Sequence, residues 1–600
     1  MKRILMILLS LLLITTIAFA AGNLEERIKT TEIQVPVQIN GMQLEDLLTL
    51  LSKESGIRIL ATPEVAGIKI DLELPAQQTL AQVFEALRNK YSLEYKMQNM
   101  QNAIIVLKNP GYDTVSAYPN GNVKSYLRLR LNFAPLEQAA IHPYPLPTSA
   151  EEYKGVTDNG FRDTLKNPTS TFSIDVDTAS YSNVRRFINT GMRPLPDAVR
   201  TEELLNYFTY DYQQPNGSEP FSITTEVGLC PWQPNHKLAL IGLQGKDIAT
   251  EKMPPSNLVF LIDTSGSMIA ENKLPLLKTA FKMLVNKLRA QDKVAVVAYA
   301  NSAGVVLKPT PGSEKEKIIE AIDKLQAGGS TAGGEGIQLA YKLAKENYLK
   351  EGNNRVILAT DGDFNVGVSS ENELTKLIEE KRNDGIFLSV LGFGMGNIKD
   401  NKMEILADKG NGNYAYIDSA QEAKRVMVGQ MAGTLYTIAK DVKLQVEFNP
   451  DKVKSYRLIG YENRALKNEE FKDDKTDAGD MGAGHSVTAL YEIVPQASAI
   501  QPNDNLMQVN IRYKKPEEAT SNLLTKTVSG ADNWITSDNL RFAAAVAEYG
   551  MLLRNSEHKG QSNYKQVLEL AKGAKGIDEE GYRSEFIRVV EITQMLGQKD

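Results

Sequence analysis

The sequence predicts an α/β protein whose centre is a doubly wound, mainly parallel sheet, with a small α+β domain before it and β-rich and helical segments flanking it. Three observations support this prediction. Strand and helix patterns alternate from about residue 257 to residue 435. The first of these strands, 258–262, is apolar throughout, as is typical of a strand covered on both faces. The next apolar residues recur at helical spacing, at Leu274, Leu277, Phe281, Leu284 and Leu288. Repeated β-α units build a parallel sheet that binds ligands at the carboxyl ends of its strands.

The other elements follow from the same periodicities. In the central segment we expect further strands at 294–299, 304–307, 356–359, 386–391 and 414–417. Helices are expected at about 315–325, 336–347, 371–383, 402–407 and 420–431. Beyond residue 439 the pattern returns to strands, at 442–448, 456–461, 486–494 and 507–513, and ends in helices at 540–554, 564–574 and 582–596.

The overall composition excludes several classes of partner and site. The chain has 600 residues, which corresponds to roughly three to five domains at about 100–200 residues each. A net charge of −6 over this length creates no basic surface field, which argues against a nucleic-acid partner. Cys230 is the only cysteine, so no intrachain disulfide can form, and its apolar setting predicts a buried, inert thiol. The four histidines show no spacing typical of zinc ligands.

The N-terminus has the pattern of a signal peptide. Lys2 and Arg3 precede an apolar run from Ile4 to Phe19, and Ala18-Phe19-Ala20 matches a small-residue cleavage site. As a helix this run would span about 24 Å, less than the roughly 30 Å of a bilayer core. We therefore interpret residues 1–20 as a signal peptide and expect an exported, soluble chain with no membrane span after cleavage.

Residues 30–108 predict a compact α+β domain. Its expected elements are a strand at 35–39, a helix at 44–51, strands at 57–60 and 68–74, a helix at 79–87 and strands at 93–96 and 103–107. In this order, and in its turn at 55–59, the segment resembles the short N-terminal domain of secretins and TonB-dependent receptors. Residues 109–153, rich in Pro, Gly, Asn and Tyr, are expected to be a linker.

That resemblance implies a place in the envelope of a Gram-negative type of bacterium, in the periplasm or at the cell surface. It also implies a partner among outer-membrane or secretion-system components. The other interpretation is a generic α+β module without a transport role.

Oxygen-bearing side chains gather in three segments of the central domain. Asp263-Thr264-Ser265-Gly266-Ser267 directly follows the first apolar strand. Gly328-Gly329-Ser330-Thr331 precedes a helix, and Thr360-Asp361-Gly362 follows the strand at 356–359. The carboxyl ends of parallel strands meet at one edge of a sheet. We therefore expect convergence of Asp263, Ser265, Ser267, Thr331 and Asp361.

The chemistry of these five side chains predicts a site for a divalent cation. All the ligands are oxygens, which favours Mg²⁺, with Mn²⁺ or Ca²⁺ as alternatives, over softer metals. The hydroxyls are neutral and leave the charge of the ion poorly balanced, so an open position would attract a carboxylate from outside. The sequence therefore predicts a protein partner that presents an exposed Asp or Glu.

The same three segments match, in order, the metal-ion-dependent adhesion site of von Willebrand factor type A domains, which this chain resembles over residues 253–437. From about Glu152 to the C-terminus it is similar to exported bacterial type A proteins called YfbK-like. The segments that carry this similarity are Ser170–Tyr181, Asn365–Val368 and Leu391–Asn397. The resemblance implies one flanking domain at 154–252 and another, β-rich and then helical, at 438–600. It implies metal-dependent adhesion or protein binding in the envelope, and no known reaction.

Two other functions fit the same residues. A bound ion could act as the Lewis acid of a hydrolase or phosphotransferase. Such chemistry needs a general base, and only Asp363 and Glu335 lie nearby in the sequence. The chain could also be a scaffold subunit of an envelope assembly, in which the site binds another segment of this same chain.

Two further motifs occur in the sequence. Asp175 and Asp177 share one strand face, which suggests a second metal, although solvated or helix-capping aspartates fit the pattern better. Gly392, Gly394 and Gly396 follow a strand as in a dinucleotide-binding loop, but Asn397 takes the place of the final glycine. We therefore expect no nucleotide cofactor.

Overall fold

The computed structural model divides into two units, Met1–Ala140 and Ile141–Asp600. In the first unit the structure describes residues 28, 32–33, 38–55, 57–61, 68–73, 78–91, 93–98 and 103–108. In the second it describes residues 151–174, 177–331, 333–362, 371–430, 433, 436–496, 503–530 and 536–597. The expected signal peptide at 1–20 and nearly all of the expected linker, 109–150, lie outside the described residues.

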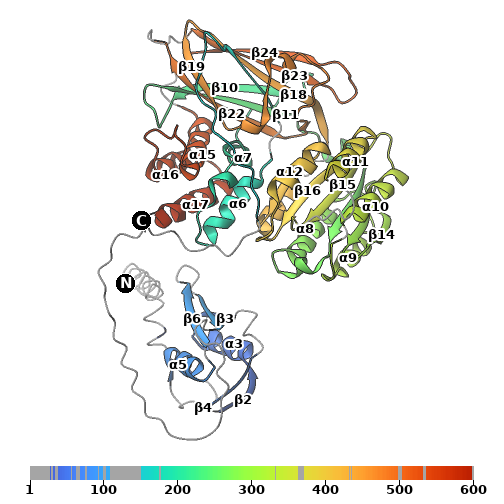
Figure 1. Cartoon of the computed structure of the whole chain (residues 1–600), viewed down its shortest axis with the longest axis vertical. Helices are drawn as coiled ribbons and strands as arrows, with labels where there is room; N and C mark the ends of the chain where they lie inside the picture. The colour runs from blue at the N-terminus through green and yellow to red at the C-terminus, as the bar shows by residue number, and fades with distance from the viewer. Residues whose placement is uncertain are drawn as a thin grey trace, which may run out of the picture. The chain divides into compact units, whose positions relative to one another are not determined.

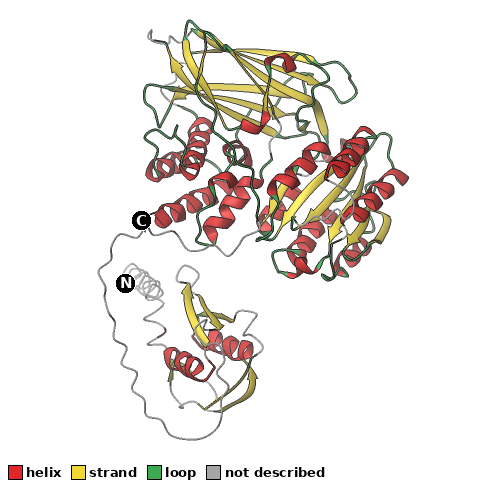
Figure 2. Ribbon diagram, viewed as in Figure 1, coloured by secondary structure: helices red, strands yellow, loops and turns green. Residues whose placement is uncertain are grey.

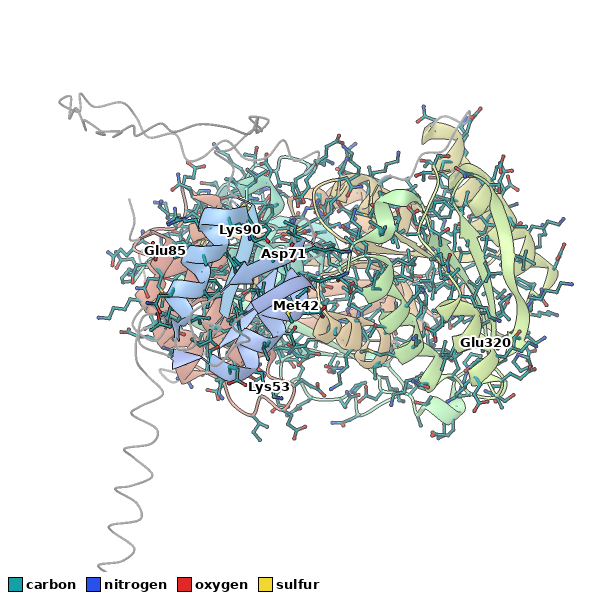
Figure 3. All side chains as sticks on the ribbon, turned by 90° about the horizontal axis from the view of Figure 1, so that it is seen from below. Met42, Lys53, Asp71, Glu85, Lys90 and Glu320 are labelled. Carbon is teal, nitrogen blue, oxygen red and sulfur yellow. The ribbon has the colours of Figure 1, made fainter. Side chains whose placement is uncertain are left out.

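The described elements of the N-terminal unit include the helices and strands that its sequence predicts, together with two short strands, at residues 32–33 and 78–79, that it does not. They are β1 (Glu32–Ile33), β2 (Gln38–Gln43), α3 (Leu44–Ser55), β3 (Arg58–Ala61), β4 (Lys69–Glu73), β5 (Gln78–Thr79), α5 (Leu80–Tyr91), β6 (Leu93–Gln98) and β7 (Ala103–Lys108). Strand β7 pairs in parallel with β3 and antiparallel with β6, while β2 pairs with β4 and β1 with β5. The apolar faces of both helices are buried, whereas Lys53, Glu85 and Lys90 are exposed (Figure 3). The kinship with secretin and TonB-receptor domains stays a prediction.

The second unit contains the predicted parallel sheet, in a central domain that we define as residues 256–430. Its strands are β12 (Ser256–Asp263), β13 (Lys293–Tyr299), β14 (Ala303–Pro311), β15 (Asn353–Thr360), β16 (Phe387–Phe393) and β17 (Tyr414–Ile417), in the spatial order β14-β13-β12-β15-β16-β17. Every neighbouring pair is parallel except β13–β14. This exception has a simple cause: only residues 300–302 separate the two strands, and so short a turn can join only antiparallel neighbours. The predicted fold class is confirmed.

Helices cover both faces of this sheet (Figure 1). They are α8 (Leu274–Lys287), α9 (Lys315–Asp323), α10 (Gly333–Glu346), α11 (Glu371–Asn383), α12 (Asp400–Lys409) and α13 (Ala420–Lys424). Alternate residues of β12 face opposite layers: Phe260 and Ile262 pack with α8, α9 and α13, and Val259 and Leu261 pack with α10, α11 and α12. This double burial explains why β12 is apolar throughout.

One predicted helix ends early. The helix expected at 420–431 is α13 followed by a wider π-helical turn, η6 (Arg425–Gly429). In this turn Arg425 is buried, and its guanidinium donates hydrogen bonds to Glu422 (2.9 Å) and Thr178 (2.7 Å). A π-helical turn of this kind often marks a place where a side chain must meet a particular partner.

The segments on either side of the central domain form one β-sandwich. Its strands are β8 (Arg162–Asp163), β9 (Thr169–Ser173), β10 (Phe221–Leu229), β11 (Lys237–Gly245), β18 (Thr437–Phe448), β19 (Val453–Ile459), β20 (Ala465–Leu466), β21 (Met481–Gly482), β22 (Ser486–Pro495), β23 (Asn505–Lys514) and β24 (Asn522–Ser529). One sheet has the order β10-β11-β22-β19-β8, and the other has β20-β9-β18-β23-β24, with β21 beside β18. Strands β11 and β22, and likewise β9 and β18, pair although the whole central domain lies between them in the chain.

A helical layer completes the second unit (Figure 2). It consists of α6 (Ala179–Asn189), α7 (Thr201–Tyr207), α15 (Asp538–Arg554), α16 (Tyr564–Gly573) and α17 (Tyr582–Gly597), with short 3₁₀ helices η3 (Pro196–Ala198), η4 (Thr250–Lys252), η5 (Gly266–Ile269), η7 (Glu462–Arg464) and η8 (Asn468–Phe471) elsewhere in the unit. Cys230 is buried in the core of this layer, as predicted, and burial raises the pKa of its thiol. Among the described residues, no helix combines the length and apolarity needed to cross a bilayer.

One buried acid in this layer predicts a pH-dependent effect on stability. Glu548 on α15 is fully buried, and burial raises its pKa to about 7 from an ordinary value of 4.5. As pH rises from 4.5 towards 7 the unfolded chain loses this proton while the folded chain keeps it, so the folded state loses relative stability. We expect Glu548→Gln not to lose stability in this way as pH rises, because glutamine has no ionisable carboxyl group. Its free energy of unfolding should gain about 2–3 kcal/mol over wild type between pH 5 and pH 8, as measured by urea unfolding. A difference independent of pH would contradict this assignment.

Candidate functional site

The two predicted acidic ligands lie at the carboxyl ends of adjacent parallel strands. Asp263 is the last residue of β12, and Asp361 directly follows β15. These strands pair in register up to Ile262 and Ala359, which brings the two acids to the same edge of the sheet. Both carboxylates are fully buried. The two acids therefore lie at neighbouring strand ends, as the predicted order of strands and helices indicated.

Hydrogen bonds between backbones hold the first two predicted segments together. The N–H of Gly266 donates to the carbonyl of Gly329 (2.9 Å), and the N–H of Gly328 donates to the carbonyl of Thr264 (2.8 Å). The Ser265 and Ser267 hydroxyls lie 3.0 Å apart. Gly329 has φ +86°, a left-handed conformation in which a side chain would be strained. This conformation explains a glycine at that turn.

Thr331 is the least constrained of the predicted ligands. It is half-buried and follows the hydrogen-bonded Gly328-Gly329 pair. Within the described residues its hydroxyl forms no hydrogen bond with the other predicted ligands. The loop that contains Thr331 therefore lies at the site, and the role of the Thr331 hydroxyl as a metal ligand stays a prediction.

The Asp263 carboxylate accepts hydrogen bonds through both oxygens. Oδ1 accepts from the backbone N–H of Ser265 (2.9 Å), and Oδ2 accepts from the hydroxyl of Thr360 (3.1 Å). Burial raises the pKa of Asp263, and the charge of Asp361 adds to this rise, although the hydrogen bonds from Ser265 oppose it. Burial and the nearby Asp263 also raise the pKa of Tyr299 at the end of β13. The surroundings of Asp263 therefore disfavour the charged form of its carboxyl group.

Asp361 has a cationic neighbour that the sequence did not point to. The ammonium of Lys273 lies 2.7 Å from Asp361 Oδ2 and 3.3 Å from the side-chain oxygen of Asn397. Burial alone would raise the pKa of Asp361, but hydrogen bonds from Lys273 and Asn397 outweigh it and lower this pKa. Gly394 has φ +79°, and a Cβ there would lie 2.3 Å from the Lys273 side chain. This close approach accounts for a glycine in the segment that superficially resembles a dinucleotide loop.

The charges of these groups fit a cation. The site holds two buried carboxylates and one ammonium, which contacts Asp361, so with both acids charged it carries a net charge of about −1 that burial makes costly. The serine hydroxyls add neutral oxygens of the kind that Mg²⁺, Mn²⁺ and Ca²⁺ accept. Within the described residues no group of three or more His, Cys, Asp or Glu side chains could hold a metal, so any ion here would rest on two acids and hydroxyls.

The other candidate residues lie elsewhere or have other partners. Glu335 is in the first turn of α10, as expected for a residue that complements the helix dipole, and Asp363 lies outside the described residues. Asp175 also lies outside them. Asp177 is buried rather than solvated. Its carboxylate accepts a hydrogen bond from the backbone N–H of Tyr414 (2.8 Å) and lies 3.4 Å from Arg464, which links the central domain to the sandwich.

Comparison with protein families gives three matches along the second unit. Residues 257–428 match the family described as von Willebrand factor type A domain. Residues 147–240 match a family described as von Willebrand factor, and residues 433–596 match the C-terminal family of "Uncharacterized protein YfbK". The match over 257–428 covers every residue of the candidate site, and the type A fold that the sequence suggested is therefore shown.

Similar individual proteins agree with these families. "Uncharacterized protein YfbK" of Escherichia coli (strain K12) is 43% identical over 463 residues, which cover 73% of this chain and 80% of that protein. "Uncharacterized protein sll0103" of Synechocystis is 26% identical over 280 residues, or 45% of this chain and 64% of that protein. Among solved structures, a von Willebrand factor type A protein from Catenulispora acidiphila aligns with 61% of this chain and 89% of its own, at 17% identity and a TM-score of 0.35.

Proposed function

We propose that this chain, which belongs to the YfbK family of von Willebrand factor type A proteins, binds an acidic group of a protein partner through a divalent cation in its type A domain. Type A domains mediate protein–protein interactions, so a binding role is the expected general function. The observation that supports the finer proposal is the buried pair of Asp263 and Asp361, which lies beside the serine loop at one edge of the sheet. One ammonium, that of Lys273, accompanies these two carboxylates.

The residues that would hold the ion are Asp263, Ser265, Ser267, Thr331 and Asp361. Mg²⁺ suits this all-oxygen set best, and Mn²⁺ or Ca²⁺ could replace it. When bound, the ion would supply an electrophilic position that accepts an Asp or Glu carboxylate. Ser267 is exposed, unlike the two acids, so the loop itself reaches the surface where a partner can approach.

The proposed location is the bacterial envelope. It rests on the charged and apolar pattern of residues 1–20 and on the secretin-like order of elements in the N-terminal unit. An exported protein with a binding domain would meet partners in the periplasm or at the cell surface, such as an outer-membrane or secretion-system component.

Partner capture should depend on the metal. The whole chain is immobilised and exposed to envelope extract in Mg²⁺, in Mn²⁺, in Ca²⁺ and in EDTA. We expect wild type to retain a protein in at least one of the metals and to release it in EDTA. Asp263→Ala should retain none. The matched control is Glu320→Ala, which removes an exposed acid on α9 of the same domain (Figure 3) and should capture as wild type does. Capture that persists in EDTA would contradict the proposal.

Lys273 should compete with the metal. We expect Lys273→Met to bind Mg²⁺ more tightly than wild type, by calorimetric titration, because no ammonium then contacts Asp361. In EDTA the same variant should lose about 3 kcal/mol of unfolding free energy, since a buried carboxylate is left without its partner. Mg²⁺ should restore much of this loss.

The control for this variant is Lys282→Met. Lys282 pairs with Asp323 at the exposed surface of the same domain, where ion pairs contribute little. It should change neither Mg²⁺ affinity nor stability by a measurable amount. Mg²⁺ binding by Lys273→Met that is weaker than wild type would show that Lys273 supports the site instead of competing for it.

A further inference from the structure

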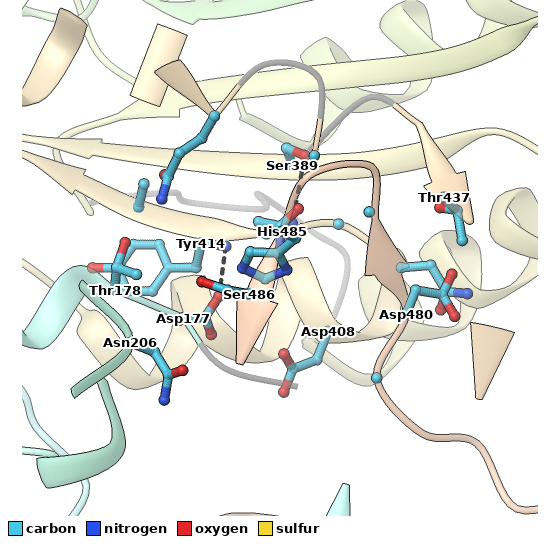
Figure 4. A pocket seen from close by; sticks show the side chains of 18 of the residues that line it. Asp177, Thr178, Asn206, Ser389, Asp408, Tyr414, Thr437, Asp480, His485 and Ser486 are labelled. Carbon is cyan, nitrogen blue, oxygen red and sulfur yellow. Dashed lines mark hydrogen bonds between the residues drawn. The ribbon is translucent and has the colours of Figure 1, made fainter. Parts of the chain in front are cut away.

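A cavity of about 600 Å³ lies between the central domain and the sandwich (Figure 4). On one side it is lined by the amino-terminal ends of β15, β16 and β17, including Arg355, Ser389 and Tyr414. On the other side it is lined by loops of the flanking segments, including Asp480 and His485. The candidate metal site lies at the carboxyl ends of β12 and β15, so this cavity is at the opposite edge of the same sheet.

Arg355 is the unusual residue in the wall of this cavity. Its side chain is 2% exposed, and its Nη1 donates a hydrogen bond to the hydroxyl of Ser389 (2.7 Å). Its Nε has no hydrogen-bond partner, and in the part of the chain that the structure describes no carboxylate forms an ion pair with it. The ring of Phe387, 5.5 Å from the guanidinium carbon, offers only a weak cation–π contact.

Other buried arginines of this unit are neutralised. Each of the following lies within 2.9 Å of a carboxylate oxygen: Arg185, Arg200, Arg425 and Arg457. An arginine cannot escape the cost of burial by losing its proton. Burial lowers the pKa of Arg355 only to about 10, so it stays charged at neutral pH. An unpaired buried charge of this kind is costly, and an anion in the cavity would relieve that cost.

The charged residues around Arg355 are already engaged. Asp408 pairs with Arg464 (2.6 Å), Asp477 pairs with Arg382 (2.9 Å), and Lys409 pairs with Glu379 outside the cavity (3.0 Å). Three further acids line the cavity: Asp177, which contacts Tyr414 and Arg464, Asp247, and Asp480, whose Oδ1 accepts a hydrogen bond from the backbone N–H of Asp441 (3.2 Å). The charge of Asp480 raises the pKa of Arg355, but among the described residues no carboxylate forms an ion pair with this arginine.

We propose that this cavity binds a small oxyanion, a phosphate or a carboxylate group, through the guanidinium of Arg355 and the hydroxyl of Ser389. The planar fork of guanidinium N–H donors suits two oxygens of such a group. The walls come from both the central domain and the flanking segments, so a bound anion would also link these two parts.

The first test is calorimetric titration of the whole chain in EDTA, with sodium phosphate in one arm and sodium succinate in the other, at constant ionic strength. We expect saturable binding in at least one arm, and the stronger arm identifies the source of the oxyanion. Arg355→Met should weaken this binding about tenfold or more, and Arg355→Lys by less. The control Lys409→Gln, which removes a paired cation from the same wall, should bind within about twofold of wild type. Absence of saturable binding in both arms, or equal weakening by both substitutions, would overturn the proposal.

A second test needs no variant, in case Arg355→Met does not fold. Crystals of wild type grown with selenate would locate the anion by its anomalous scattering. A peak beside Arg355 and Ser389 is the expected result. Selenate that is found only elsewhere, or not found at all, would overturn the proposal.

Discussion

Asp263→Asn is expected to abolish Mg²⁺ binding while leaving the protein folded. The amide keeps the oxygen that accepts from Ser265 N–H but removes the charge that the ion needs. Loss of a charged ligand should weaken binding by more than the roughly 10–100-fold seen for outer-shell groups. Calorimetric titration with Mg²⁺ measures this directly.

Unlike wild type, the same variant should not lose stability when EDTA removes the metal. Burial and the charge of Asp361 raise the pKa of Asp263, so the negative charge of Asp263 destabilises the folded protein when no metal is bound. Asp263→Asn should therefore be no less stable than wild type in EDTA, and Mg²⁺ should no longer raise its melting temperature. The control is Asp323→Asn, in which the acid lost is an exposed one. A variant that still gains stability from Mg²⁺ would remove Asp263 from the ligand set.

Arg185→Met is expected to be the most destabilising single substitution. Arg185 on α6 is buried and contacts four side chains outside its own helix, from three parts of the unit: Tyr207 on α7, Asp418 and Glu422 of the type A domain, and Glu585 on α17. Its loss leaves buried carboxylates without their shared cation, although Arg425 still pairs with Glu422. The free energy of unfolding should fall by about 3–5 kcal/mol, as measured by urea unfolding.

Lys424→Ala is the matched control for this substitution. Lys424 also joins the type A domain to the C-terminal segment, through Glu580 at 2.6 Å, but both side chains are about half exposed. Exposed pairs contribute less than about 1 kcal/mol, so this variant should remain close to wild type. Similar losses in the two variants would mean that burial does not control the strength of this interface.

The parallel sheet could be predicted from the sequence because the apolar pattern that specifies each strand and helix lies within a short segment. A continuous apolar strand such as β12, followed by the apolar stripe of α8, specifies a β-α unit without reference to distant residues. The positions of Asp263 and Asp361 followed from that topology alone, since both end strands of the same sheet. The metal itself stays a prediction.

The neighbours of Asp361 could not be predicted in the same way. Lys273 precedes α8 and Asn397 follows β16, and neither belongs to a motif that marks it as part of the site. Their contacts depend on the Lys273 side chain passing over Gly394. The sequence does contain a weak signal for Lys273. This charged residue directly precedes an apolar helix and lies close to the serine segment, so the site itself is one of the few places where it can find a polar partner.

The sandwich shows a different limit. The sequence gives good reason to expect strands at 442–448 and 486–494, but periodicity does not say which strand lies beside which. The pairing of Phe172 on β9 with Leu444 on β18 spans the entire type A domain. The expected division into flanking domains at 154–252 and 438–600 therefore separates segments that share both sheets.

This shared sandwich has a consequence for the order in which the chain can fold. The type A domain lies within one continuous segment and can complete its sheet as soon as β17 is available. Strand β11 must wait for β22, since Lys237 pairs with Ile493. Until then its edge is open to pairing with strands of other chains. A chain emerging from N- to C-terminus would therefore finish its binding domain first and pass through an interval in which the flanking strands need protection from aggregation.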